Sequence, residues 1–215
     1  MMKALIFDLD GTLLNTIGDL HQSTNHALRV FGFPERTLEE VNSFVGNGLA
    51  MLIRNAVPEG TAEDDVQSVL KEMKKHYEEH YHDLTVPYPG IPELLDALKK
   101  QNVPMAIVSN KADPFVQKLR ELFFEDQITV ALGESPNIPR KPAPDMVYHG
   151  LEELGISGED AFYVGDSEVD ILTAKNARLP CLAVTWGFRS EEQLKEAGAT
   201  ILIHDPTELL KWATE

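Results

Sequence analysis

Four aspartates of this sequence have the residue type and the spacing needed for metal or phosphate chemistry. Asp8 and Asp10 directly follow the apolar run of residues 4–7. Asp166 and Asp170 follow a second apolar run. Side chains two residues apart in extended backbone point to the same side, and side chains four residues apart are neighbours at the start of a helix. The spacing therefore predicts two carboxylate pairs, each at the carboxyl end of a strand.

Each pair also has an ordinary structural explanation. Asp10, Gly11 and Thr12 together are typical of a solvated turn. Asp166 and Asp170 suit the N-terminus of a helix, where the helix dipole favours acidic side chains by about 0.3 to 1 kcal/mol. These explanations account for either pair alone, but they do not explain why both pairs end strands of one sheet.

Two further segments supply groups that can bind an oxyanion or neutralise the carboxylates. Ser109 and Asn110 end another apolar run, and both side chains can donate hydrogen bonds. Lys141 lies in the proline-rich segment 139–144. Four clustered carboxylates would be prohibitive without cations, and this lysine together with a divalent ion would offset most of their charge. Oxygen ligands without a His/Cys set favour Mg²⁺ over zinc, and a cationic centre among carboxylates suits a phosphoryl group.

The apolar runs that precede these residues recur along the chain and alternate with helical patterns. Short apolar runs are typical of strands that are buried on both faces of a parallel sheet. We expect strands at residues 4–7, 105–108, 128–132, 162–164, 181–184 and 201–203. We expect helices at residues 91–100, 114–123, 145–154, 168–177 and 191–197. This alternation predicts an α/β fold with a parallel sheet and helices on both faces.

One long stretch interrupts the alternation. Residues 16–83 contain helical patterns, such as those of residues 17–31, 49–57 and 61–81, but no convincing strand. We therefore expect an inserted all-helical domain at residues 15–84, with residues 1–14 and 85–215 forming the catalytic core.

Composition limits the function classes. The 215 residues carry 19 Lys+Arg against 35 Asp+Glu, a net charge of −16 that would repel nucleic acid and anionic lipid surfaces. No apolar run approaches the length of about 20 residues that a membrane span needs. The single cysteine, Cys181, cannot form an internal disulfide, and the first residues do not resemble a secretory segment. We expect a cytoplasmic protein, monomeric or homodimeric, with no nucleic-acid or membrane partner.

Four ordered motifs together resemble those of the haloacid dehalogenase-like hydrolase superfamily. They are the segment Asp8 to Leu13, the pair Ser109-Asn110, the pair Lys141-Pro142, and Gly165-Asp166 with Asp170. The resemblance covers essentially the whole chain. It implies a Rossmann-like sheet, with the helical insertion as a cap domain after the first motif.

The resemblance also implies roles for the carboxylates. Asp8 would be the nucleophile that forms an aspartyl-phosphate, and Asp10 would be the acid/base that protonates the leaving oxygen and then activates water. Asp8, Asp166 and the main-chain carbonyl of Asp10 would hold Mg²⁺, with Asp170 supporting them.

The other motif residues would handle the phosphoryl group. The resemblance implies that Ser109 and Asn110 bind phosphoryl oxygens, that Thr12 is a further substrate-binding residue, and that Lys141 neutralises the nucleophile and the transferring group. Asp10 argues for phosphoryl transfer, because dehalogenase members of the superfamily do not use a second aspartate of the first motif in this way.

The sequence gives a weaker indication of the substrate. The loop of residues 44–48 leads into a helix that contains Arg54, and backbone donors of Gly46, Asn47 and Gly48 could face the catalytic centre or simply start the helix. This segment is similar to that of phosphoglycolate phosphatases and close relatives, as are residues 186–189 and 192–199. Asn15 departs from the pattern, because many such relatives have an aspartate there.

We therefore expect a Mg²⁺-dependent phosphatase that hydrolyses a small phosphorylated metabolite, with phosphoglycolate the first substrate to try. A phosphosugar mutase or a pyrophosphatase of the same fold remains open, as does a non-catalytic binding module. An intact set of four motif side chains argues against the last, because a scaffold without catalysis has no reason to collect uncompensated carboxylates.

Overall fold

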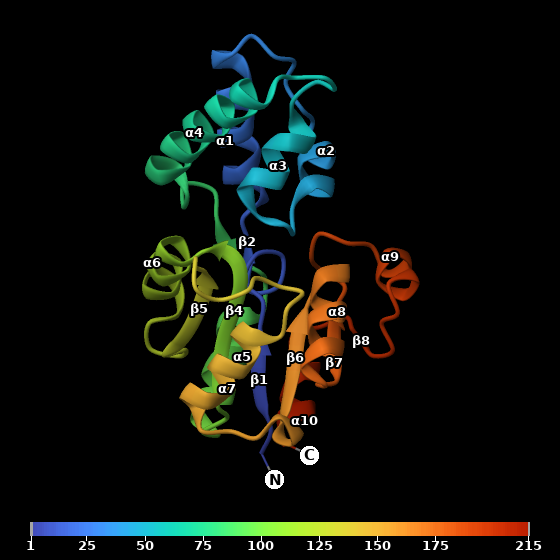
Figure 1. Ribbon diagram of the computed structural model, residues 1–215. Helices are drawn as coiled ribbons and strands as arrows, with labels where there is room; N and C mark the ends of the chain where they lie inside the picture. The colour runs from blue at the N-terminus through green and yellow to red at the C-terminus, as the bar shows by residue number, and fades with distance from the viewer. Residues whose placement is uncertain (1, 215) are drawn as a thin grey trace. The chain divides into compact units, whose positions relative to one another are not determined.

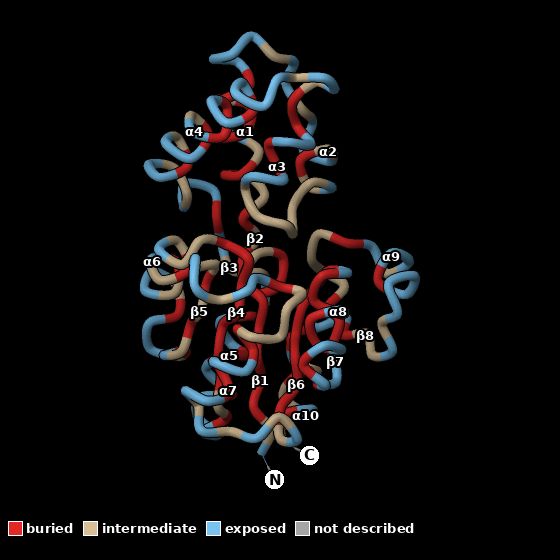
Figure 2. The backbone as a smooth tube through the Cα atoms, in the orientation of Figure 1, coloured by how far each residue is buried: buried red, intermediate tan, exposed pale blue. Residues whose placement is uncertain are grey.

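The computed structural model describes residues 2–214, which divide into two compact units (Figure 1). The first unit combines the chain up to Leu14 with the chain from Pro87 onward, and the second is Asn15–Val86. Each unit has its own buried interior (Figure 2). The insertion of one unit into the other explains why the first motif is separated from the rest of the catalytic sequence.

The first unit is built on a six-stranded parallel sheet. Its strand order is β5-β4-β1-β6-β7-β8, so β1 lies between β4 and β6. The strands are β1 (Ala4–Phe7), β4 (Met105–Ala112), β5 (Val130–Glu134), β6 (Ala161–Gly165), β7 (Cys181–Val184) and β8 (Leu202–Ile203). The prediction of an α/β fold with a parallel sheet is confirmed.

The helices of the first unit follow the strands in the alternation that the sequence predicts. They are α5 (Ile91–Lys100), α6 (Asp113–Phe124), α7 (Asp145–Leu154), α8 (Glu168–Ala177), α9 (Glu191–Glu196) and α10 (Glu208–Thr214), with a 3₁₀ turn at Gly158–Asp160. The short helix α10 is an addition that the apolar pattern did not indicate.

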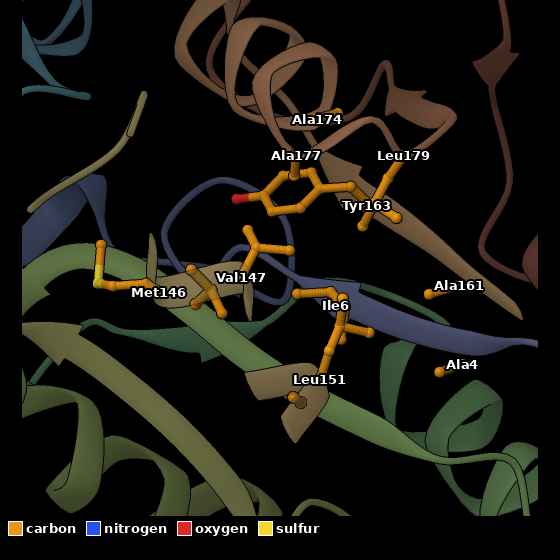
Figure 3. Close-up of a cluster of buried hydrophobic side chains, with 12 residues drawn as sticks. Ala4, Ile6, Met146, Val147, Leu151, Ala161, Tyr163, Ala174, Ala177 and Leu179 are labelled. Carbon is orange, nitrogen blue, oxygen red and sulfur yellow. The ribbon is translucent and has the colours of Figure 1, made fainter. Parts of the chain in front are cut away.

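Helices cover both faces of the sheet because successive strand side chains point to opposite sides. Residues 4–7 of β1 are all fully buried. On one face, α7 and α8 pack over Ile6, and Figure 3 shows the ring of Tyr163 among Val147, Ala174 and Ala177. On the other face, Phe162 meets Trp212 of α10 edge to face at 5.5 Å. Both faces of the central strands are therefore apolar, as their uninterrupted hydrophobic sequences require.

The end of β4 differs from the prediction. The apolar run suggested that this strand ends at residue 108, yet it continues to Ala112, with a shift in its pairing register to β5 between Val108 and Ala112. Gly133 allows the close approach, because a Cβ there would lie 2.8 Å from the Lys111 carbonyl oxygen. Polar residues 109–111 therefore belong to the strand.

The second unit consists of four helices. They are α1 (Ile17–Val30), α2 (Leu38–Phe44), α3 (Gly48–Ala56) and α4 (Glu63–His80). The predicted all-helical insertion is confirmed, although α2 was not expected. Its start is fixed by a capping box in which Thr37 and Glu40 exchange hydrogen bonds. Two short strands, β2 (Leu14–Asn15) and β3 (Val86–Pro87), pair where the chain passes between the units.

A buried carboxylate ties the two ends of the second unit together. Asp19 of α1 is fully buried and accepts hydrogen bonds from the backbone N–H groups of Leu84 and Thr85, each at 2.9 Å, and from the Thr85 hydroxyl at 2.7 Å. All three donors lie in the segment that follows α4. Asp19 therefore fixes the returning chain against α1.

We predict that Asp19→Ala lowers the free energy of unfolding by about 3 kcal/mol, because it removes the acceptor of the buried Thr85 N–H and of the partly buried Leu84 N–H. Urea denaturation measures the change. Asp64→Ala, at an exposed position in the first turn of α4, is the control and should cost less than about 1 kcal/mol. Equal losses in the two variants would contradict this role for Asp19.

Candidate active site

Four of the predicted site residues lie at the carboxyl ends of three adjacent strands. Asp8 follows β1, Asp166 follows β6, and Ser109 and Asn110 belong to the end of β4. Because β1 pairs with both β4 and β6, these ends lie side by side. This is the edge at which open α/β sheets bind ligands.

Three of the predicted carboxylates form a cluster that can hold a metal ion. Oxygen atoms of Asp8, Asp166 and Asp170 all lie within 4.8 Å of one another, and all three residues are buried. An all-oxygen set of this kind suits a hard divalent cation. The carboxylate of Asp10 is not a member of this cluster.

Asp170 is held by donors on both of its oxygens. Oδ1 accepts hydrogen bonds from Lys141 Nζ at 2.8 Å and from the Tyr163 hydroxyl at 3.0 Å. Oδ2 accepts from the backbone N–H groups of Asp166 and Ser167 and from the Ser167 hydroxyl. Ser167 is the N-cap of α8 and forms a capping box with Asp170. This dense bonding suits a carboxylate that supports the cluster and anchors Lys141.

Asp166 is fixed by residues that are distant in the sequence. The Thr12 hydroxyl donates to its Oδ1 at 3.0 Å, and the backbone N–H of Phe188 donates to its Oδ2 at 2.7 Å. The indole N–H of Trp186 in turn donates to the Thr12 carbonyl at 3.0 Å. Gly187 lies so close that a Cβ there would meet the Asp166 Cβ at 2.3 Å. The loop after β7 therefore shapes one side of the cluster.

Lys141 is the cation of the cluster. Its Nζ lies 2.8 Å from Asp8 Oδ1 and 2.8 Å from Asp170 Oδ1, and its side chain is only 2 % exposed. The Asn110 side-chain amide donates to the Lys141 carbonyl at 3.0 Å, which fixes the loop to the end of β4. Burial alone would lower the pKa of Lys141, but the carboxylates of Asp170 and Asp8 more than offset burial and hold it well above its usual value.

One lysine does not neutralise the cluster. Burial raises the pKa of Asp8 to about 7, against the opposing attraction of Lys141 and with added repulsion from Asp170. Burial, together with repulsion from Asp170 and Asp8, also holds the pKa of Asp166 well above its usual range. A divalent cation bound among these carboxylates would stabilise their ionised forms. The residues therefore fit a metal ion.

The family model of the haloacid dehalogenase-like hydrolases matches residues 5–184. The chain belongs to this family. It is also 32 % identical over 219 residues to phosphoglycolate phosphatase 1 of Pseudomonas aeruginosa, a match that covers 99 % of this chain and 80 % of the relative.

Two solved structures resemble the whole hydrolase. One is a protein of Lactobacillus delbrueckii subsp. bulgaricus with a provisional assignment as a phosphoglycolate phosphatase, at 35 % identity, a TM-score of 0.94 and full coverage of both chains. The other is a predicted phosphoglycolate phosphatase from Haemophilus somnus, at 28 % identity and a TM-score of 0.90, covering 98 % of this chain and 97 % of that one. Within residues 2–214, no helix of the hydrolase combines the length and apolar character of a membrane span.

The sequence analysis did not identify several residues of this site. Tyr163 and Ser167 bind Asp170, and Phe188 binds Asp166 through its backbone, so no motif of reactive side chains marks these positions. Lys111 is a further residue that the sequence analysis does not single out, and its Nζ lies 2.9 Å from Asp10 Oδ1. Its two polar neighbours Ser109 and Asn110 were the available signal.

The predicted substrate residues of the insertion lie in the second unit. Gly46 and Gly48 have positive φ angles of 123° and 75° on either side of Asn47, the N-cap residue of α3. Arg54 of the same helix donates to both carboxylate oxygens of Glu63, at 2.7 and 2.8 Å. A substrate carboxylate at Arg54 would therefore have to compete with Glu63.

We predict that stabilisation of the hydrolase by Mg²⁺ grows as the pH rises. Because the pKa of Asp8 is raised to about 7, the folded protein keeps a proton that the unfolded chain loses near pH 4. Asp8 therefore lowers the stability of the metal-free protein as the pH rises through this window. Metal binding needs the deprotonated carboxylate, so the gain from Mg²⁺ should increase over the same window.

Thermal denaturation with and without Mg²⁺ at about pH 5.5 and about pH 8 tests this expectation. The Tm shift should be larger at the higher pH. Asp166→Asn is the control and should lose most of the shift at both pH values. A shift in the unmodified protein that does not depend on pH would contradict the assignment of Asp8 as a ligand.

Proposed function

We propose that this hydrolase is a Mg²⁺-dependent phosphatase that acts on a small phosphorylated metabolite through an aspartyl-phosphate on Asp8. The observation that carries the proposal is the position of Asp8, which lies 2.8 Å from the Lys141 ammonium and within the carboxylate cluster. A nucleophilic carboxylate between a fixed cation and a metal site is suited to attack an anionic phosphorus centre.

The metal would be held by Asp8, Asp166 and the main-chain carbonyl of Asp10, with Asp170 supporting them. When bound, Mg²⁺ neutralises the phosphoryl oxygens and the carboxylates around them. The proposal assigns this ion rather than zinc because the cluster offers only oxygen ligands.

The protein groups that act on phosphorus are Asp8 and Lys141. Asp8 Oδ1 accepts hydrogen bonds from the Leu9 backbone N–H at 2.7 Å and lies 2.8 Å from Lys141 Nζ, which fixes the orientation of the carboxylate. Its attack forms a bond from the carboxylate to phosphorus while the bond from phosphorus to the leaving oxygen breaks. Lys141 stabilises the charge on the transferring group, and Ser109 and Asn110 bind its oxygens.

Asp10 would transfer the protons in both half-reactions. In the first, its carboxyl gives a proton to the departing alcohol oxygen. In the second, its carboxylate takes a proton from the water that attacks the aspartyl-phosphate. Inorganic phosphate leaves and the Asp8 carboxylate is restored.

Phosphoglycolate is the substrate that we propose first. Support comes from relatives named phosphoglycolate phosphatase, which are similar over nearly the full length of the chain. Under this proposal, Gly46, Asn47 and Gly48 of the insertion offer backbone donors to the substrate, and Arg54 pairs with its carboxylate.

The first test measures phosphate release from a panel of phosphorylated metabolites, with and without Mg²⁺. We expect Mg²⁺-dependent release with the highest kcat/KM for phosphoglycolate. Asp8→Asn should lower kcat on the order of 10⁴-fold or more, because it removes the nucleophile and an anionic ligand together. Asp126→Asn, at an exposed position after α6, should leave turnover unchanged.

Two outcomes would contradict the proposed function. One is an Asp8→Asn variant that keeps a tenth of the turnover. The other is an isomerised sugar phosphate in place of inorganic phosphate, which would indicate a mutase.

We further predict that Arg54→Ala lowers kcat/KM for phosphoglycolate about tenfold or more, but lowers it much less for 4-nitrophenyl phosphate, which carries no carboxylate for Arg54. Arg29→Ala is the matched control, because Arg29 also pairs with a glutamate on the surface of the second unit. Equal losses on both substrates would mean that Arg54 serves only the stability of this unit.

A further inference from the structure

A second buried lysine lies at the same sheet edge and has no role in the reaction described above. Lys111 follows Asn110 near the end of β4, and its side chain is only 4 % exposed. Its Nζ lies 2.9 Å from Asp10 Oδ1, and the Asp10 side chain is itself 14 % exposed. This pair is therefore largely removed from solvent, unlike the ion pairs on the protein surface.

The burial of Lys111 has an energetic cost that needs an explanation. Removing an ammonium group from water is strongly unfavourable before any partner is counted. Lys141 contacts Asp8 and Asp170, and Lys111 contacts Asp10. With both lysines and a divalent ion present, the charges of the four aspartates are balanced.

The fold holds the Lys111 backbone in place. Its N–H donates to the Ser109 hydroxyl at 3.3 Å, and the register shift of β4 lies within this segment. Its carbonyl oxygen is close enough to Gly133 that only glycine fits there without a shift of the chain. Lys111 is thus anchored beside the residues proposed to bind the phosphoryl group.

We propose that Lys111 is a positioning residue that holds the Asp10 carboxyl group where it can pass a proton to the leaving oxygen. This role rests on the proposed function. In the step concerned, Asp8 forms a bond to phosphorus, the bond to the leaving oxygen breaks, and the proton of Asp10 moves to that oxygen. Asp10 then carries a negative charge, which the Lys111 ammonium stabilises.

Leaving groups that differ in their need for a proton provide a specific test. An alkoxide, as released from phosphoglycolate, must be protonated, whereas 4-nitrophenolate departs as a stable anion. Lys111→Met should therefore lower kcat/KM for phosphoglycolate at least about tenfold more than for 4-nitrophenyl phosphate. The ratio kcat/KM is the right quantity because it covers the steps through departure of the leaving group and excludes hydrolysis of the aspartyl-phosphate.

A double-mutant cycle shows whether Lys111 acts through Asp10. Asp10→Asn should show the same dependence on the leaving group, and adding Lys111→Met to it should cause little further loss. The double variant also removes both charges of the pair, so it remains measurable even where Lys111→Met alone, which leaves Asp10 buried without this partner, folds poorly. Lys99→Met, at an exposed position of α5, is the control for loss of a lysine.

Equal losses on the two substrates in Lys111→Met would overturn the positioning role, as would a further loss of more than about fivefold in the Asp10→Asn background. Both of these outcomes can be observed only if the unmodified protein is an active phosphatase. If the unmodified protein released phosphate from neither substrate, the proposed function itself would fail, and the role of Lys111 with it.

Discussion

The electrostatic cost of placing several carboxylates together away from water governs this sheet edge. Asp8, Asp166 and Asp170 are buried within reach of a single ion, and each raises the free energy of ionising the others. Lys141 lies between Asp8 and Asp170 and offsets part of this repulsion. The remaining excess of negative charge suits this edge to a divalent cation and, under the proposed function, to a phosphoryl group bound with it.

Neutral hydrogen-bond donors also stabilise the carboxylates of this cluster. Asp170 receives backbone hydrogen bonds at the N-terminus of α8, where the helix dipole also favours a carboxylate. Asp166 receives a hydroxyl from the segment after β1 and a backbone N–H from the loop after β7. Tyr163 joins this network to the apolar core, since its ring packs against α7 and α8 while its hydroxyl binds Asp170. Packing of the sheet and the geometry of the site are therefore linked.

In the proposed function, the first unit carries out the chemistry and the second unit contributes to substrate choice. All the carboxylates and lysines of the proposed chemistry belong to the first unit, whose parallel sheet fixes them. The second unit has its own buried interior, and the carboxylate of Asp19 secures its returning chain. Substitutions on the surface of this separate helical unit need not disturb the carboxylate cluster. This independence suits the role in substrate choice that we propose for the unit.

Local sequence determined the strands, the parallel sheet, the helical insertion and the positions of the four motifs, because apolar periodicity and motif spacing are properties of neighbouring residues. It did not reveal that β4 continues through Lys111, because a polar strand end in a shifted register resembles a loop. Nor did it reveal the bonds from Phe188 to Asp166 or from Lys111 to Asp10. These contacts join segments about 20 to 100 residues apart, so only the strand order and the packing of the tertiary structure decide them.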